Sequence, residues 1–220
     1  SARGVNCTAD QIIIGAGSEY LMMLLTQILG AGRTIAMENP TYRQAYRVFE
    51  SLGCQMKPVE MDAHGMNVRL LEESGVDIAY VMPSHQYPTG VVMPVKRRQE
   101  LLSWAGRGEK RYLIEDDYDS EFRYRGKPVP ALQGMDIQGK VIYMGTFSKS
   151  IAPAIRVGYL VLPAPLLAVY KRKCGFYAST VSRIDQKIIY QFLAEGHYER
   201  HLNRMRAIYK GKHDVLMSEL

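Results

Sequence analysis

Short apolar segments alternate with helical patterns along this chain, and that alternation constrains its fold most strongly. Segments typical of buried strands are residues 12–14, 34–37, 55–58, 78–82, 112–115, 141–144 and 157–162. Helical patterns at residues 19–29, 43–52 and 95–106 separate several of them, and residues 123–134 and 148–154 are expected to be loops. This order predicts a three-layer α/β domain with a seven-stranded, mainly parallel sheet. The link between the last two strands is too short for a helical crossover, so we expect the last strand to be antiparallel.

One lysine stands just after the strand at residues 141–144. The strand runs into Thr146, Ser148 and Lys149, and Arg156 follows after a short turn. A lysine amine needs a desolvated, cation-rich or otherwise perturbed setting to react with an aldehyde, and we expect this turn to provide one. An isolated lysine is most often a solvated surface charge. The interpretation of Lys149 as a Schiff-base amine beside a phosphate therefore depends on three further motifs.

A glycine-rich turn at residues 15–19 joins the first strand to the first helix and contains Gly17, Ser18 and Glu19. Backbone N–H groups at such a helix start are unpaired and face one point, with the positive end of the helix dipole behind them. This arrangement favours a phosphate. A dinucleotide fingerprint needs a third glycine where Tyr20 stands, which excludes a Rossmann-type site.

A cluster of acidic residues follows the strand at residues 112–115. Asp116, Asp117, Asp119 and Glu121 stand there with Tyr118 among them. A carboxylate at the carboxyl end of a strand lies where α/β proteins bind ligands, and it can hold a heterocyclic nitrogen protonated. Paired aspartates also serve as metal ligands or as general acid–base pairs. The five histidines show no ligand spacing near them, so we expect no metal here.

The turn at residues 83–90 reads Pro-Ser-His-Gln-Tyr-Pro-Thr-Gly and ends the strand at residues 78–82. Its prolines and glycine fix a turn at the strand end. His85 is either a catalytic base or, as is more frequent for a histidine in a turn, a hydrogen-bonded structural residue.

Taken together and in this order, the four motifs resemble the fold type I enzymes that use pyridoxal 5'-phosphate (PLP), the aminotransferase class I/II family. The acidic run, the His-Gln-Tyr-Pro-Thr-Gly turn and Gly-Thr-Phe-Ser-Lys-Ser are most similar to the aminotransferase-like domains of MocR-type GntR transcription regulators. The resemblance covers essentially the whole chain. It implies the large PLP-binding domain of that fold.

The resemblance implies a role for each motif. Lys149 matches the lysine that forms a Schiff base with PLP, and Asp116 matches the aspartate that pairs with the pyridine nitrogen, so these two are the catalytic candidates. Tyr118 matches a tyrosine near the phenolic oxygen of the cofactor, and Tyr42 matches the aromatic residue that stacks on its ring. The residues that match the phosphate-binding set are Gly17, Ser18, Glu19, Thr146, Ser148 and Arg156.

Two positions depart from the family pattern. Tyr87 stands where many family enzymes have an asparagine that contacts the cofactor oxygen, so Tyr118 is left to carry that contact. Glu19 stands where many relatives have glutamine. Because a carboxylate beside a phosphate is unfavourable, we expect Ser18 and the backbone to bind the phosphate there.

The length of 220 residues suits one large α/β domain but not the full family unit. We interpret residues 1–182 as the PLP-binding large domain and residues 183–220 as connector helices toward a small C-terminal domain that the chain lacks. The connector helices are expected at residues 184–193 and 197–220. The winged helix-turn-helix of the regulator branch is also absent upstream. The chain therefore looks like a piece of a longer protein.

Composition limits the partners and the compartment. The net charge of +6 invites a nucleic-acid interpretation, but the basic residues are spread and no recognition motif accompanies them. We therefore expect DNA contact only through a missing N-terminal module. Cys7, Cys54 and Cys174 lack CxxC spacing, and no apolar run is long enough to span a membrane, which favours a cytoplasmic protein.

Two functional classes remain open at this point. In a sensor, an amino compound displaces Lys149 from PLP and biases attached DNA-binding modules. In an amino acid aminotransferase, the released Lys149 shuttles a proton. Both use the same cofactor site, so whether the chain is an enzyme is undecided, although the motifs favour the sensor. The resemblance also implies a homodimer with the site at the subunit interface.

Overall fold

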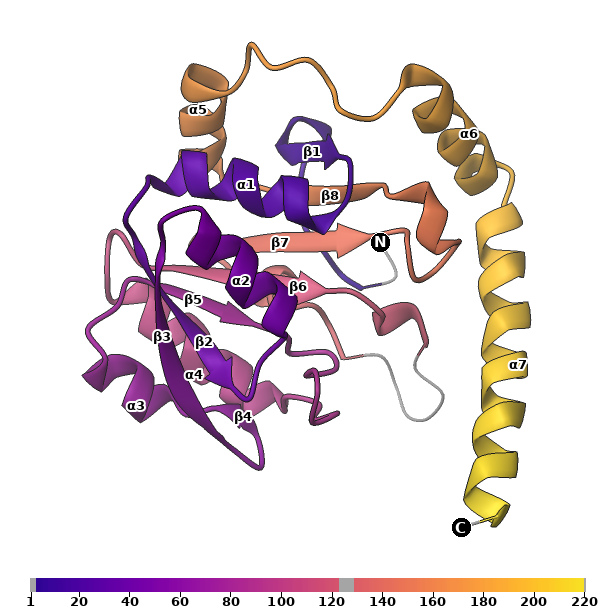
Figure 1. Cartoon of the computed structure of the whole chain (residues 1–220), viewed down its shortest axis with the longest axis horizontal. Helices are drawn as coiled ribbons and strands as arrows, with labels where there is room; N and C mark the ends of the chain where they lie inside the picture. Colours follow the sequence, from indigo (N-terminus) through magenta and orange to yellow (C-terminus); the bar gives the residue numbers. More distant parts are fainter. Residues whose placement is uncertain (1–2, 123–128, 220) are drawn as a thin grey trace.

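The computed structural model describes residues 3–122 and 129–219, and these ranges contain one eight-stranded mixed sheet (Figure 1). Its strand order is β1-β8-β7-β6-β5-β2-β3-β4. The strands are β1 (Ile12–Gly15), β2 (Thr34–Asn39), β3 (Gln55–Asp62), β4 (Gly65–Met66), β5 (Ile78–Val81), β6 (Tyr112–Asp117), β7 (Val141–Thr146) and β8 (Gly158–Val161).

The sheet confirms the predicted fold class, with one strand more than expected. Strands β3, β2, β5, β6 and β7 run parallel, and β8 pairs antiparallel with both β7 and β1, as predicted for the last strand. The additional strand is β4, which pairs antiparallel with the end of β3 through Met61 and Met66. Two residues are too few to show a periodic pattern, so this strand could not be predicted from the sequence.

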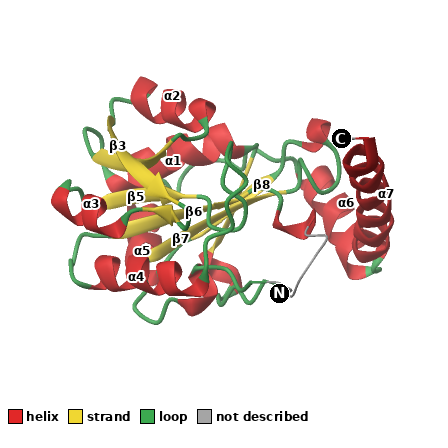
Figure 2. Cartoon of the chain, turned by 90° about the horizontal axis from the view of Figure 1, so that it is seen from below, coloured by secondary structure: helices red, strands yellow, loops and turns green. Residues whose placement is uncertain are grey.

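Helices cover both faces of the sheet, as Figure 2 shows for α1 and α2 on one side and α4 on the other. The helices are α1 (Ser18–Leu29), α2 (Arg43–Ser51), α3 (Val68–Glu73), α4 (Val95–Gly106), α5 (Ala164–Lys173), α6 (Arg183–Ala194) and α7 (His197–Glu219). One buried cluster joins α1, α2 and α5 to the sheet, and a second joins α3 and α4 to the opposite face. These two cores hold the carboxyl ends of the parallel strands in fixed positions.

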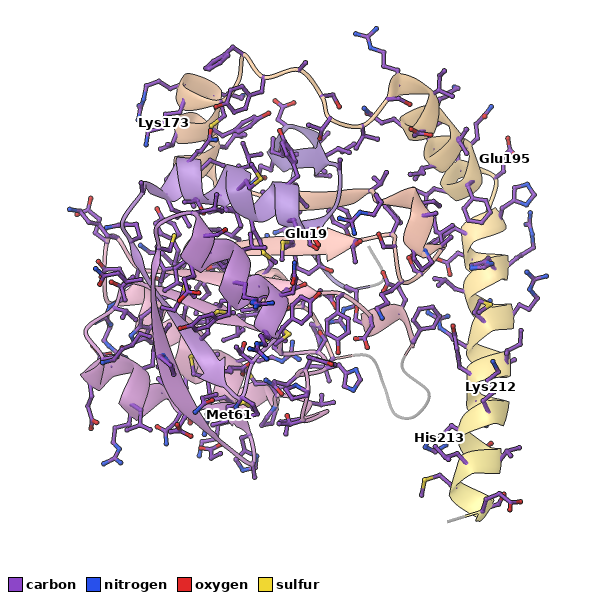
Figure 3. The ribbon with its side chains drawn as sticks, viewed as in Figure 1. Glu19, Met61, Lys173, Glu195, Lys212 and His213 are labelled. Carbon is purple, nitrogen blue, oxygen red and sulfur yellow. The ribbon has the colours of Figure 1, made fainter. Side chains whose placement is uncertain are left out.

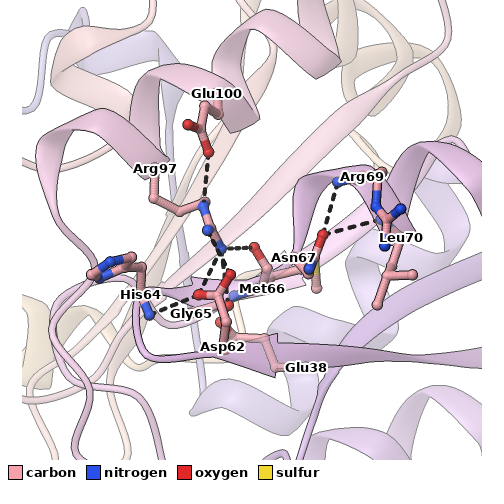
Figure 4. A network of polar contacts seen from close by, with 10 residues as sticks. All are labelled: Glu38, Asp62, His64, Gly65, Met66, Asn67, Arg69, Leu70, Arg97 and Glu100. Carbon is pink, nitrogen blue, oxygen red and sulfur yellow. Dashed lines mark hydrogen bonds and ion pairs between the residues drawn. The ribbon is translucent and has the colours of Figure 1, made fainter.

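An arginine on α4 fixes the β3–β4 hairpin against the sheet (Figure 4). The Arg97 guanidinium donates to Asp62 at 2.7 Å, to Glu100 at 2.9 Å and to the carbonyl of Met66 at 2.6 Å. Asn67 then caps α3, because its side chain accepts from the N–H groups of residues 69 and 70. The network explains why so short a strand as β4 is ordered.

The loop segments deviate in part from expectation. Of the predicted loop at residues 123–134, residues 123–128 lie outside the described ranges, and its end enters a 3-10 turn, η3 (Gln133–Met135). The predicted loop at residues 148–154 ends in another such turn, η4 (Pro153–Ile155). Both are single turns, which helical periodicity does not detect.

The last two helices lie beside the sheet rather than over it (Figure 1). Both were expected from the sequence, at residues 184–193 and 197–220, and residue 220 lies outside the described ranges. Near its start α7 buries Tyr198 and Leu202, and further along Arg206 donates to the carbonyl of Glu121 at 2.7 Å. Among the described helices, none is both long and apolar enough to cross a membrane. The division into residues 1–182 and 183–220 stays a prediction.

Candidate functional site

A cavity of about 340 Å³ opens at the carboxyl ends of β5, β6 and β7. Ligands of open α/β sheets bind at such strand ends, and the volume suits a small molecule. Every site residue proposed from the sequence, except Gly17, lines this cavity. These residues are Ser18, Glu19, Tyr42, Tyr87, Asp116, Tyr118, Thr146, Ser148, Lys149 and Arg156.

Three lining residues were not expected from the sequence: Met82, Met144 and Gly145. Met82 directly follows β5, and the other two belong to β7, so all three stand at or near a strand end. Their position near strand ends is the sequence signal by which they could have been found. Gly145 lets the ring of Tyr159 pack closely against the backbone of β7, because a Cβ atom at Gly145 would lie 2.5 Å from that ring.

Lys149 lies on the turn that follows β7. The Ser148 N–H donates to Thr146 Oγ1 at 3.1 Å, and the Ile151 N–H donates to the Phe147 carbonyl at 2.9 Å, so the turn is held from within. The Lys149 side chain reaches the cavity and is exposed. Lys149 is thus not desolvated; of the settings expected for it, a cation-rich one is offered by Arg156, which lines the same cavity.

Asp116 is the buried carboxylate of the cavity. Its oxygen accepts a hydrogen bond from the phenol of Tyr80, a fully buried residue of β5. Burial raises the pKa of Asp116 to about 7, and the Tyr80 hydrogen bond acts in the opposite direction. Burial thus favours the neutral form of Asp116, and a cation placed beside it would favour the charged form. Tyr80 was missed in the sequence because its partner lies on a different strand.

Tyr118 and His85 stack at the edge of the cavity, with ring centroids 6.1 Å apart. His85 Nδ1 lies 2.6 Å from Asp119 Oδ2 and 3.3 Å from the Tyr118 oxygen. Burial raises the pKa of Asp119, and the hydrogen bond with His85 lowers it. The contacts favour the interpretation of His85 as a hydrogen-bonded residue that orients Tyr118.

Two tyrosines from different loops form the aromatic wall. Tyr42 directly precedes α2, and its ring meets that of Tyr87 edge to face at 5.7 Å. Tyr87 is 50% exposed, so it closes the cavity only on the outer side. The pKa of Tyr42 is raised by burial and by the charges of Glu19 and Asp116.

The remaining wall joins the start of α1 to the arginine after η4. Gly17 has a φ of 88°, which favours glycine, and a Cβ atom there would lie 2.9 Å from Arg156 Nη2. Arg156 itself has a φ of 49°, the single positive value among the described non-glycine residues, at a cost of about 1 kcal/mol or more. This strained backbone brings the guanidinium flat against the turn.

The arginine in this wall is paired with a carboxylate. Arg156 Nη2 donates to Glu19 Oε2 at 2.6 Å, and Ser18 Oγ lies 3.4 Å from the same oxygen. Figure 3 places Glu19 at the lower side of α1, toward the carboxyl end of β7. This pairing was not foreseen, since the two residues are 137 positions apart.

A parallel sheet with a lysine turn, a buried aspartate and an arginine-lined helix start at one cavity is the arrangement of the large domain of fold type I aminotransferases. The comparisons agree with this class. The profile of the family Aminotransferase class I and II matches residues 2–220, and the chain belongs to that family.

Curated relatives point to the regulator branch. The uncharacterized HTH-type transcriptional regulator YdeL of Bacillus subtilis is 41% identical over 98% of this chain and 46% of its own length. The HTH-type pyridoxine biosynthesis transcriptional regulator PdxR of Corynebacterium glutamicum is 34% identical over 99% of this chain and 48% of its own length. The predicted resemblance to MocR-type regulators is thereby confirmed. The chain spans about half the length of these relatives.

A solved enzyme structure shares the fold. The kynurenine aminotransferase of Pyrococcus horikoshii, in complex with PMP, superposes with a TM-score of 0.83 at 30% identity, over 94% of this chain and 54% of the enzyme. The match supports the fold described above.

Proposed function

We propose that this chain is the PLP-binding, aminotransferase-like effector domain of a MocR-type transcription regulator. The observation that carries the proposal is the convergence of Lys149, Asp116 and Arg156 on one cavity at the carboxyl ends of the strands. The relatives YdeL and PdxR, described as HTH-type regulators, favour this function over that of a free-standing aminotransferase.

The residues of the cavity fit PLP. When bound, PLP supplies an aldehyde that an amine can attack and a pyridine ring that withdraws electrons. The Asp116 carboxylate is buried, as a partner for a protonated ring nitrogen should be. Tyr42 offers a ring face to a flat heterocycle. Gly17 leaves space that a side chain would fill, and Arg156 occupies its edge with a fixed positive charge.

The roles of the remaining residues follow from their positions. Lys149 provides the amine for the aldehyde of PLP, and Tyr118 contacts the phenolic oxygen of the cofactor. Thr146 and Ser148 supply hydroxyl donors on the same wall as Arg156. Tyr87 replaces a family asparagine and adds only an exposed aromatic surface, so Tyr118 carries the oxygen contact.

In the regulator, a small amino compound is the effector, because an amine can take the place of Lys149 at the aldehyde. We further propose a homodimer that completes the site, DNA contact through a separate N-terminal module, and a cytoplasmic location. All three cysteines, Cys7, Cys54 and Cys174, are free thiols, which agrees with a reducing compartment.

The test combines spectra with turnover. PLP is added to the purified protein, and the visible band of the lysine-bound cofactor is followed while a panel of amino acids and amines is titrated. A sensor shifts its spectrum with an amino compound but converts little of it when 2-oxoglutarate is present. Sustained production of glutamate would instead establish the aminotransferase alternative.

A further inference from the structure

The carboxylate of Glu19 occupies the partner position on Arg156 that the proposed function gives to a phosphate. The two side chains are joined at 2.6 Å, and Ser18 Oγ lies 3.4 Å from the same Glu19 oxygen. Two residues expected to bind the phosphate are therefore already arranged around an anion. That anion belongs to the chain itself.

The Arg156 side chain has a second contact that does not depend on the ion pair. The Arg156 backbone is fixed in a left-handed conformation, and its guanidinium lies against Gly17, where a Cβ atom would be only 2.9 Å from Nη2. Both side chains reach solvent, Arg156 with 56% and Glu19 with 36% of its side chain exposed, so water can take over the hydrogen bonds of the Glu19 carboxylate. The carboxylate can therefore leave while the arginine stays.

The charge of Glu19 persists at neutral pH. Burial acts to raise its pKa, but the hydrogen bonds from its own backbone N–H and from Arg156 outweigh burial and lower the pKa below its ordinary value of 4.5. Its place in the first turn of α1, beside the positive end of the helix dipole, also favours the charged form. A phosphate at this site thus meets a negative charge rather than a neutral amide.

We propose that Glu19 is a built-in competitor for the phosphate of the cofactor, and this rests on the proposed function of the cavity as a PLP site. Glu19 releases Arg156 when a phosphate monoester enters, and it takes the arginine back when the monoester leaves. The exchange lowers the affinity for PLP and keeps binding reversible. Occupancy of the cavity then follows the concentration of free PLP.

The experiment compares the wild-type chain with Glu19→Gln, which keeps the size and hydrogen-bonding capacity of the side chain and removes its charge. The matched control is Glu73→Gln on α3, another exposed glutamate that faces an arginine, Arg69, at 3.8 Å. Dissociation constants are measured by absorbance and calorimetry for PLP, for pyridoxal, which lacks the phosphate, and for inorganic phosphate. Circular dichroism verifies the fold of each variant.

We expect Glu19→Gln to bind PLP and inorganic phosphate about five- to tenfold more tightly, in line with the loss of one exposed ion pair and of one like-charge contact. Affinity for pyridoxal should not change, and Glu73→Gln should match the wild type throughout. Unchanged affinity for PLP would refute the competitor role. Weaker binding of PLP would also refute it, because Glu19 would then position Arg156 for the phosphate.

The two proposals fail in different ways. If neither the wild type nor Glu19→Gln forms a lysine-dependent visible band, the proposed function of the cavity is wrong. Suppose instead that both proteins form the band. If Glu19→Gln then has the same dissociation constants as the wild type for PLP and for inorganic phosphate, only the competitor role is wrong. An equal gain for pyridoxal and PLP would place the effect of Glu19 away from the phosphate and would overturn the inference as well.

Discussion

Tyr143 donates a 2.7 Å hydrogen bond to Asp117, and this contact lies on the face of the sheet opposite to Asp116. Successive side chains of a strand point to opposite faces, so Asp116 enters the cavity while Asp117 meets Tyr143 and, at 3.3 Å, Arg3. Two adjacent and chemically identical residues therefore have different tasks. Asp117 ties the N-terminal segment to the sheet.

This separation predicts different consequences for the two substitutions. Asp116→Asn should weaken PLP binding by tenfold or more, because a charged hydrogen bond is worth about 1.5 to 3 kcal/mol. Asp117→Asn should leave the dissociation constant nearly unchanged but lower the free energy of unfolding by about 2 to 3 kcal/mol, since Arg3 loses a buried partner. Absorbance titration and urea unfolding measure the two effects. Equal losses of PLP affinity would indicate a diffuse acidic site.

A second prediction concerns the amine. Lys149→Ala should abolish the visible band of bound PLP and leave the far-UV circular dichroism unchanged, because the exposed side chain contributes little to packing. Lys171→Ala, on the exposed side of α5, is the matched control and should keep the band. A band that survives in Lys149→Ala would assign the amine to another lysine.

A third prediction concerns pH and the buried Glu38 of β2, seen in Figure 4. Burial raises its pKa to about 7, although the N–H groups of Met82 and Met66 donate to it and lower the pKa. In the unfolded chain the value is close to the ordinary 4.5. Between these values the folded state binds more protons, so this group makes the free energy of unfolding fall as pH rises from about 4.5 to about 7.

A glutamine cannot ionise, so the free energy of unfolding of Glu38→Gln should lack this decline with rising pH. The free energy of unfolding of the variant minus that of the wild type should therefore be larger at pH 8 than at pH 5, by roughly 2 to 3 kcal/mol. Urea unfolding at both pH values gives the comparison, with Glu73→Gln as the exposed control. The same difference at both pH values would show that Glu38 is not protonated in the folded state near neutrality.

A fourth prediction concerns DNA. The 220-residue chain has a net charge of +6, and its described helices, including the exposed α7, carry no recognisable groove-reading pattern. Any binding to DNA should be independent of sequence and should fall steeply between about 50 and 200 mM salt, because counterion release alone drives it. A gel shift with specific and scrambled duplexes measures this. A sequence-selective, salt-resistant complex would contradict it.

Much of the fold could be predicted from local patterns. The bounds of α4 were predicted as the structure has them, at residues 95–106, because an amphipathic pattern covers the whole helix. β3 was expected to end at residue 58 but continues to Asp62. The extension is stabilised by pairing with β4 and by Arg97, and a local pattern cannot show a partner that lies elsewhere in the chain.

The site was predictable to a different degree. Motifs at strand ends named the residues that meet at the cavity, because topology brings strand ends together. The contacts between them were not predictable: Tyr80 behind Asp116 and Glu19 on Arg156 are pairings between distant segments. The exposure of Lys149 was also missed, since a sequence does not show which cavity walls are closed.

The contact between the lysine turn and α7 has a mechanical consequence. Phe147, two residues before Lys149, meets the ring of Tyr198 edge to face at 6.0 Å, near the start of a 23-residue helix. At 1.5 Å per residue the helix extends about 30 Å beyond that contact, alongside the sheet (Figure 1). The same helix is held a second time further along, because Arg206 donates to the Glu121 carbonyl at 2.7 Å. α7 is therefore a strut that braces the segment after β6 against the turn that carries Lys149.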